Sequence, residues 1–216
     1  MSGRKTGALA AAVVIASLVF MGCARAGAGD GSPRATSPTA GLGSSFTLPA
    51  GLIEDWREGD GDQASVLLFD ADGFVVHEYG PVTIDAGFFP GLLITAPPQE
   101  ALLTVDDLAN DFNAELETSD PNARFQFFEE LDITGFFTTD LAYRETDDTL
   151  VGWMYADRNV EITAEEVTTV TGVTTTMIID LNLVTGWNRT VFNVDEAEST
   201  VAVTTGPEPA GARWVM

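Results

Sequence analysis

Short runs of alternating apolar and polar residues cover most of the chain, and this period of two is typical of β-strands. The alternation is clear at 174–183 and 199–204, where threonine and valine, which favour strands, are frequent. Residues 65–70 and 74–77 form another pair of runs, and Asp70-Ala-Asp-Gly73 between them predicts a hairpin turn. The pattern predicts a mainly β fold, an antiparallel β-sandwich of about 8–10 short strands.

Six further segments have the pattern of strands, and a hairpin is expected across residues 156–159. Pro90, in the first of these segments, indicates an edge strand or an irregular start. The segments are 88–95, 124–133, 150–155, 160–163, 186–194 and 213–216.

One short helix is expected after Thr104. Thr104 is its predicted N-cap, and Asp106 and Asp107 would place negative charge in the first turn, where the helix dipole favours it. The helix should end by Thr118, before Asp120-Pro121. Its expected buried face consists of Leu108, Phe112 and Leu116.

The N-terminal segment has the order of a secretory signal, with basic residues, an apolar run and small residues before a cysteine. Arg4 and Lys5 precede an apolar run of about 14 residues, whereas a membrane-spanning helix needs roughly 20. Phe20-Met-Gly-Cys23 then resembles the lipobox of bacterial lipoproteins. The resemblance implies a signal peptide at 1–22 and a lipid on Cys23, the only cysteine in the chain. An ordinary secretory signal with a cysteine near the cut is the competing interpretation.

Two segments are expected after the cut. Residues 23–46 are predicted to be a disordered tether, because Gly, Ala, Ser, Pro and Thr dominate there without apolar periodicity. Residues 47–216 are predicted to form the β-rich domain. Two subdomains that meet near 100–123 are an open alternative.

The chain is strongly acidic, with 33 acidic and 10 basic residues and a net charge of −23. Removal of Arg4 and Lys5 with the signal peptide lowers the net charge by two, to −25. Such a surface repels nucleic acid and anionic lipid headgroups, so no nucleic-acid partner is expected. The membrane would be reached through the lipid. Salt adaptation, solubility and cation binding are three open explanations of the acidity.

Two further resemblances favour a sandwich. Residues 64–98 contain a strand, the Asp-x-Asp-Gly turn, a strand and then Gly87-Phe88 leading to a strand that ends at Pro97-Pro98. This block is similar to the carboxypeptidase-regulatory-like or transthyretin-like β-sandwich. Residues 149–194, with Gly152-Trp-Met-Tyr-Ala-Asp-Arg158 and Gly186-Trp-Asn188, are similar to the C-terminal part of some uncharacterised envelope lipoproteins. Neither resemblance implies catalytic residues.

Few residues offer site chemistry. His77 is the only histidine, so a two-histidine metal site cannot form within one chain, and an exposed or edge-strand position is expected for it. Asp70 and Asp72 are weak calcium candidates, because position 12 of an EF-hand loop counted from Asp70 would be Pro81. Carboxylate pairs such as Glu129-Glu130 are expected at turns or solvated faces.

Tryptophans could stack on sugars, although core packing is their usual role. The tryptophans are Trp56, Trp153, Trp187 and Trp214.

The sequence predicts no cofactor and no catalytic centre. The leading hypothesis is a non-enzymatic binding or structural module, lipid-anchored on the extracytoplasmic side of the cell membrane or at the outer membrane. Its protein, glycan or ion ligand is not identified by the sequence. The alternatives are a carbohydrate- or calcium-binding surface lipoprotein and a hydrolase that uses only carboxylates.

Overall fold

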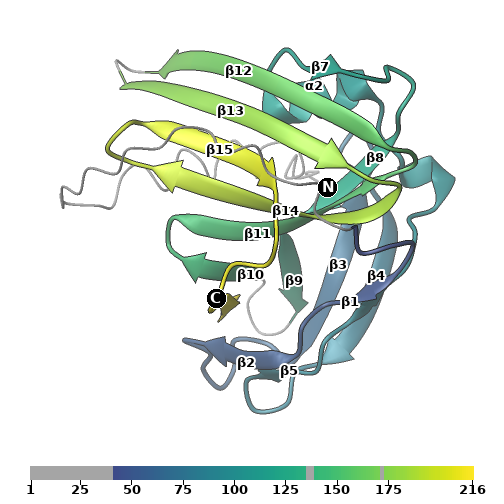
Figure 1. The fold of residues 1–216 in the computed structure, drawn as a ribbon. Helices are drawn as coiled ribbons and strands as arrows, with labels where there is room; N and C mark the ends of the chain where they lie inside the picture. Colours follow the sequence, from purple (N-terminus) through teal and green to yellow (C-terminus); the bar gives the residue numbers. More distant parts are fainter. Residues whose placement is uncertain (1–40, 135–138, 171–172) are drawn as a thin grey trace, which may run out of the picture.

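A computed structural model describes residues 41–134, 139–170 and 173–216, and their fold is mainly β (Figure 1). The predicted fold class is confirmed, because strands dominate and the described residues contain one α-helix and a large, curled, sandwich-like sheet. Cys23, the expected signal peptide and most of the expected tether lie outside the described residues.

Sixteen strands are described, more than the sequence predicted, because some expected segments are divided and other strands lie outside the expected segments. The segment 88–95, for example, gives two strands of two residues separated by Pro90 and Gly91, and Gly91 has a φ of 84°. The strands are β1 (Phe46–Thr47), β2 (Gly51–Glu54), β3 (Gln63–Phe69), β4 (Val75–Thr83), β5 (Phe88–Phe89), β6 (Leu93–Ile94), β7 (Glu117–Thr118), β8 (Phe125–Phe128), β9 (Glu130–Thr134), β10 (Thr139–Thr146), β11 (Thr149–Ala156), β12 (Val160–Val170), β13 (Val173–Leu183), β14 (Gly186–Asp195), β15 (Thr200–Thr205) and β16 (Arg213–Val215).

The predicted helix is confirmed at its start and is shorter than expected. A 3₁₀ turn, η1 (Gln99–Ala101), precedes α2 (Val105–Phe112), and Thr104 caps α2 in a reciprocal capping box with Asp107. Asn113 then adopts a left-handed conformation with a φ of 50°, which ends the helix. Leu116 therefore lies beyond the helix, whose buried residues are Leu108 and Phe112.

Fourteen strands form one sheet, and β1 and β6 form a separate pair. The main path is β4-β3-β9-β10-β11-β14-β15-β13-β12-β7, and β16, β2, β5 and β8 branch from it. Most strand pairs are antiparallel, as expected, and two are parallel: β13 with β15, and β16 with β2. β15 returns antiparallel to β14 and inserts between β14 and β13, so it must run in the direction of β13.

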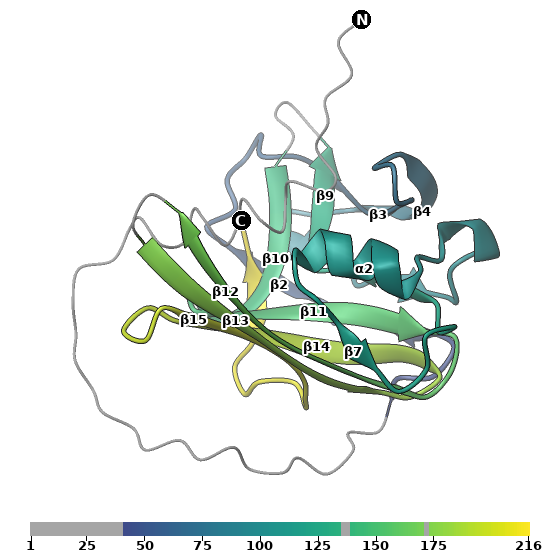
Figure 2. The same cartoon turned by 90° about the horizontal axis from the view of Figure 1, so that it is seen from above.

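The sheet turns a corner where β10 and β11 diverge. β10 pairs with β11 at 143–146 and with β9 at 139–142, whereas β11 continues beside β8 at 153–156. The segment from β8 to β9 thus passes between the two strands, and Glu129 joins β8 to β9. On one side of this corner β12, β13, β15 and β14 run side by side, and β3, β4 and β9 cross them steeply on the other (Figures 1 and 2).

Two apolar cores lie on the two faces of the sheet. The larger contains Trp153, Trp187 and Trp214, each at most 2% exposed. The indole N–H groups of Trp187 and Trp214 donate to the carbonyls of Thr95 and Pro49, both at 2.8 Å, so their burial leaves no indole donor unpaired. The second core lies under α2, which extends along the other face (Figure 2).

Three boundaries and pairings differ from those expected. Leu42 and Gly43 exchange backbone hydrogen bonds with Trp187 at 2.7 and 2.8 Å, so the folded part begins inside the expected tether. The expected hairpin across 156–159 does not form, because β11 pairs with β14, β10 and β8, whereas β12 pairs with β13 and β7. β3 and β9, from before and after 100–123, pair with one another, so the two halves of the chain share one sheet.

Candidate functional site

The two candidate calcium ligands lie in the turn between β3 and β4. Asp70 Oδ1 accepts the backbone N–H groups of Asp72 at 3.0 Å and Phe74 at 2.9 Å, and Gly73 has a φ of 79°. The predicted hairpin turn is thus confirmed, and the Asp70 carboxylate serves it. Within the described ranges no three His, Cys, Asp or Glu side chains are grouped as metal ligands.

His77 lies on β4, where the sequence placed it, at one end of the main strand path. Its half-buried ring stands edge-on to Tyr79 at a centroid distance of 4.5 Å. Burial raises the pKa of Tyr79 to about 12, although its hydroxyl donates to the Thr95 carbonyl at 2.8 Å. These contacts give His77 a packing role on this strand.

The buried tryptophans are unavailable as sugar platforms. Trp153, Trp187 and Trp214 stack among other rings in the larger core, with Trp153 and Trp214 6.2 Å apart between ring centroids. Trp56 is partly buried, and its indole N–H points to the Gly61 carbonyl at 3.4 Å. The carbohydrate alternative therefore loses the support that the strand tryptophans had given it.

Four acidic side chains lie on β4, β9 and β10, on either side of β3 in the strand order. We call this group the acidic face, and it consists of Glu78, Glu130, Asp132 and Asp140. Asp132 and Asp140 are direct cross-strand partners, so their side chains project on the same side. Ser65 is the partner of Asp132 on the other neighbouring strand, and its hydroxyl donates to Glu78 Oε1 at 2.6 Å.

Burial and neighbouring charges disfavour ionisation of three members of the acidic face, Glu130, Asp132 and Asp140. Partial burial raises the pKa of Asp132, and the charges of Asp140 and Glu78 raise it further. Partial burial likewise raises the pKa of Glu130, and partial desolvation raises the pKa of Asp140, which the solvent still reaches. The charge of Asp140 adds to the effect on Glu130, and the Arg144 guanidinium opposes it.

Glu129, at the corner of the sheet, has the largest change among the carboxyl groups of the described residues. Burial raises its pKa to about 7, and the adjacent charge of Glu130 contributes in the same direction. The expectation that this pair sits at a turn or a solvated face was wrong, because both side chains are partly buried where β8 passes into β9. The strand alternation that breaks at 128–131 was the available sequence signal.

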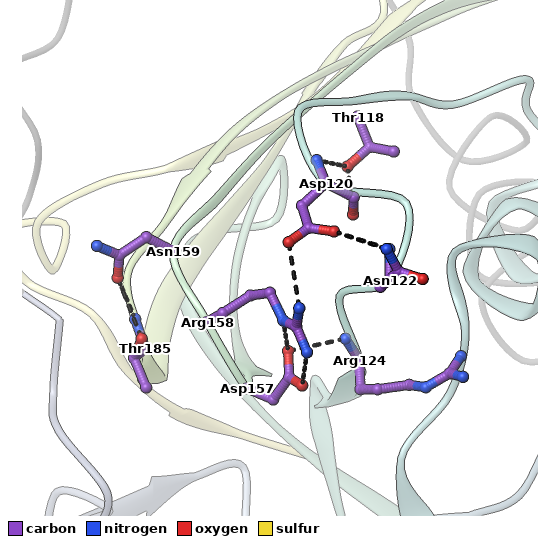
Figure 3. A network of polar contacts seen from close by, with 8 residues as sticks. All are labelled: Thr118, Asp120, Asn122, Arg124, Asp157, Arg158, Asn159 and Thr185. Carbon is purple, nitrogen blue, oxygen red and sulfur yellow. Dashed lines mark hydrogen bonds and ion pairs between the residues drawn. The ribbon is translucent and has the colours of Figure 1, made fainter.

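A second charged region has the opposite character (Figure 3). We call it the Arg158 network, and it consists of Asp120, Asp157 and Arg158. The Arg158 guanidinium donates to both oxygens of Asp157 at 3.0 Å and to Asp120 Oδ2 at 3.2 Å. These bonds link the β7–β8 loop to the β11–β12 turn.

Hydrogen bonds to the ionised forms lower the pKa of both aspartates of this network. The largest contribution for Asp157 is its bond from Arg158, and the Arg124 backbone N–H adds another at 3.0 Å. The largest contribution for Asp120 is the backbone N–H of Asn122, which lies 2.9 Å from Oδ1. The network thus stabilises turns and leaves no free carboxylate oxygen pointing to a shared ligand position (Figure 3).

The chain matches no protein-family model, and no curated protein and no solved structure is significantly similar to it. No helix in the described part of the chain has the length and apolarity needed to cross a bilayer.

Proposed function

We propose that the chain is a lipid-anchored protein of the bacterial cell envelope whose β-rich domain is a non-enzymatic binding or structural module. The observation that carries the proposal is the position of Cys23, the only cysteine, directly after an apolar run and Gly22. Its thiol would form the thioether to the lipid, and two or three acyl chains would anchor the protein stably. The domain would lie on the extracytoplasmic side of the cell membrane or at the outer membrane.

The charge of the chain supports attachment through lipid. A mature net charge of −25 disfavours binding to anionic headgroups, so a protein of this composition needs another means of staying at a membrane. The domain would present its turns and the acidic face to a partner, whose identity is open.

Metabolic labelling with a radioactive fatty acid tests the anchor. The full chain should incorporate label and fractionate with membranes, and Cys23→Ala should do neither. Ser37→Ala, which changes the tether instead of the lipobox, is the control and should label like the wild type. Equal labelling of Cys23→Ala, or no labelling of the wild type, contradicts the anchor.

The carboxylate-only hydrolase is a second candidate because of Glu129. A glutamate with a pKa of about 7 beside a second carboxyl group has the properties of a general acid in glycoside hydrolysis. A panel of chromogenic glycosides tests this candidate with the wild type, Glu129→Gln and the exposed control Glu115→Gln. Turnover lost only in Glu129→Gln supports it, and a flat wild-type response rejects it.

A further inference from the structure

The cross-strand partnership of Asp132 and Asp140 places two carboxylates side by side within the hydrogen-bonded β9–β10 pair. The four residue pairs of these strands run from Thr139 opposite Ile133 to Ala142 opposite Glu130, so the aspartates lie inside the paired segment. Like charges directly opposite one another destabilise an antiparallel pair. Ionisation of both aspartates therefore opposes the pairing of β9 with β10.

Neighbouring elements add negative charge to this arrangement. Glu130 lies two residues before Asp132 on the same face, and Glu78 reaches the face from β4 through its bond to Ser65. Arg144, on β10, is the described cation that acts on Glu130. The polar and charged groups that face the aspartate pair from the described elements are Gln63 and Ser65 on β3, Glu78 on β4, Glu130 on β9 and Arg144 on β10.

His77 does not belong to this set. It is the cross-strand partner of the buried Leu68, and its ring contacts Tyr79 on the side of the larger core. Proton uptake near the aspartates therefore involves carboxyl groups, which lose their mutual repulsion when one of them is protonated.

We propose that the acidic face is a proton-sensitive switch: protonation tightens the pairing of β9 with β10, and ionisation of Asp132 and Asp140 loosens it. A shared proton converts two opposing charges into a neutral acid that can donate a hydrogen bond to the remaining carboxylate. The pairing is then tightest in an acidic medium and weaker in a neutral one. This behaviour belongs to the folded domain and does not depend on the membrane anchor.

Hydrogen–deuterium exchange of the full chain in detergent, at pH 4.5 and pH 7.5, tests the switch. Labelling times are corrected for the intrinsic pH dependence of amide exchange. Protection of the β9–β10 amides should fall at least about tenfold between the two pH values, relative to the β12–β13 amides. The double variant Asp132→Asn/Asp140→Asn should abolish this loss of protection. If the double variant does not fold, the single variant Asp140→Asn takes its place in the comparison.

Asp180→Asn is the matched control. Asp180 is an exposed strand aspartate whose cross-strand partners are Thr163 and Thr204, so its replacement removes one charge without relieving an opposing carboxylate. It should keep the full loss of protection at β9–β10. Three outcomes overturn the proposal: an equal loss of protection in the β9–β10 and β12–β13 pairs, no loss in the wild type, or a loss at β9–β10 that persists in the Asp132 and Asp140 variants.

Discussion

The acidic face and the Arg158 network place aspartates in opposite electrostatic surroundings. Asp132 and Asp140 lie opposite one another on the paired strands β9 and β10, whereas Asp157 and Asp120 share the guanidinium of Arg158. The pKa of the first pair is raised and that of the second pair is lowered. In a chain with 33 acidic residues, the number of carboxylates therefore says little about stability, and the position of each relative to its neighbours decides its effect.

These opposite changes link folding to pH in opposite directions. A carboxyl group with a raised pKa binds its proton more tightly in the folded state, so its contribution is lost as pH rises from the ordinary pKa to the folded one. A carboxyl group with a lowered pKa contributes above the ordinary pKa, and its contribution is lost as pH falls through the folded one. The pH of maximum stability should lie between the two ranges.

The largest expected effect is the pH profile of the wild type. Urea unfolding between pH 3 and pH 8 should give a maximum free energy of unfolding near pH 4–5. The free energy should then decrease by on the order of 3 kcal/mol toward pH 7.5, as the acidic face and Glu129 ionise in the folded state. A maximum at or above pH 7 would mean that the acidic face costs little when ionised.

Glu129→Gln should remove a large part of that decrease. The variant cannot ionise, so it should be more stable than the wild type by on the order of 2 kcal/mol at pH 7.5 and equally stable near pH 4. Parallel urea titrations at the two pH values measure the difference. Glu115→Gln, at an exposed position, should leave both curves unchanged. If Glu129→Gln is destabilised at pH 7.5, the carboxylate has a stabilising partner instead.

The sequence predicts local structure well here because local structure depends on neighbouring residues. The hairpin turn at Asp70 and the helix cap at Thr104 are both confirmed, and each uses hydrogen bonds that span at most four residues. The helix end was misplaced, because the apolar spacing that reaches Leu116 continues past the left-handed Asn113. Spacing alone does not reveal a residue that leaves the helical conformation.

The charged regions could not be predicted, because both depend on which strands become neighbours. Asp132 and Asp140 are close in sequence, but their opposition requires the register of β9 against β10. Arg158 bonds to Asp120 across 38 positions, because the expected hairpin between β11 and β12 does not form and the turn meets the β7–β8 loop instead. A pattern of alternating residues identifies strands and leaves their partners open.

Asp157→Asn should have a smaller effect of the opposite sign to that of Glu129→Gln. It removes a charge that accepts bonds from Arg158 and from the Arg124 backbone, and both side chains of the ion pair are partly exposed. The loss should be about 0.5–1 kcal/mol at pH 7.5 after solvent screening, and it should be smaller at pH 3, because the contribution is lost as pH falls from the ordinary pKa through the lowered one. Urea unfolding at both pH values measures it. Asp72→Asn, an exposed turn aspartate, is the control, and an equal loss at pH 3 would assign the effect to packing instead of charge.

Arg158→Lys should have the smallest effect. It should distinguish the two limbs of the stability profile, the acidic limb below the pH of maximum stability and the limb above it. Lysine keeps the charge but cannot bond both oxygens of Asp157 while also reaching Asp120. The pKa of both aspartates should move back toward the ordinary value, so the acidic limb of the stability profile shifts to higher pH. The limb above pH 5 belongs to the acidic face and Glu129, so it should keep the slope seen in the wild type and in the control Arg57→Lys. It should lie slightly below both, because the contribution of the two lowered pKa values is present throughout that range. A change in the slope of that limb would show that the two charged regions are coupled through the sheet that both of them border.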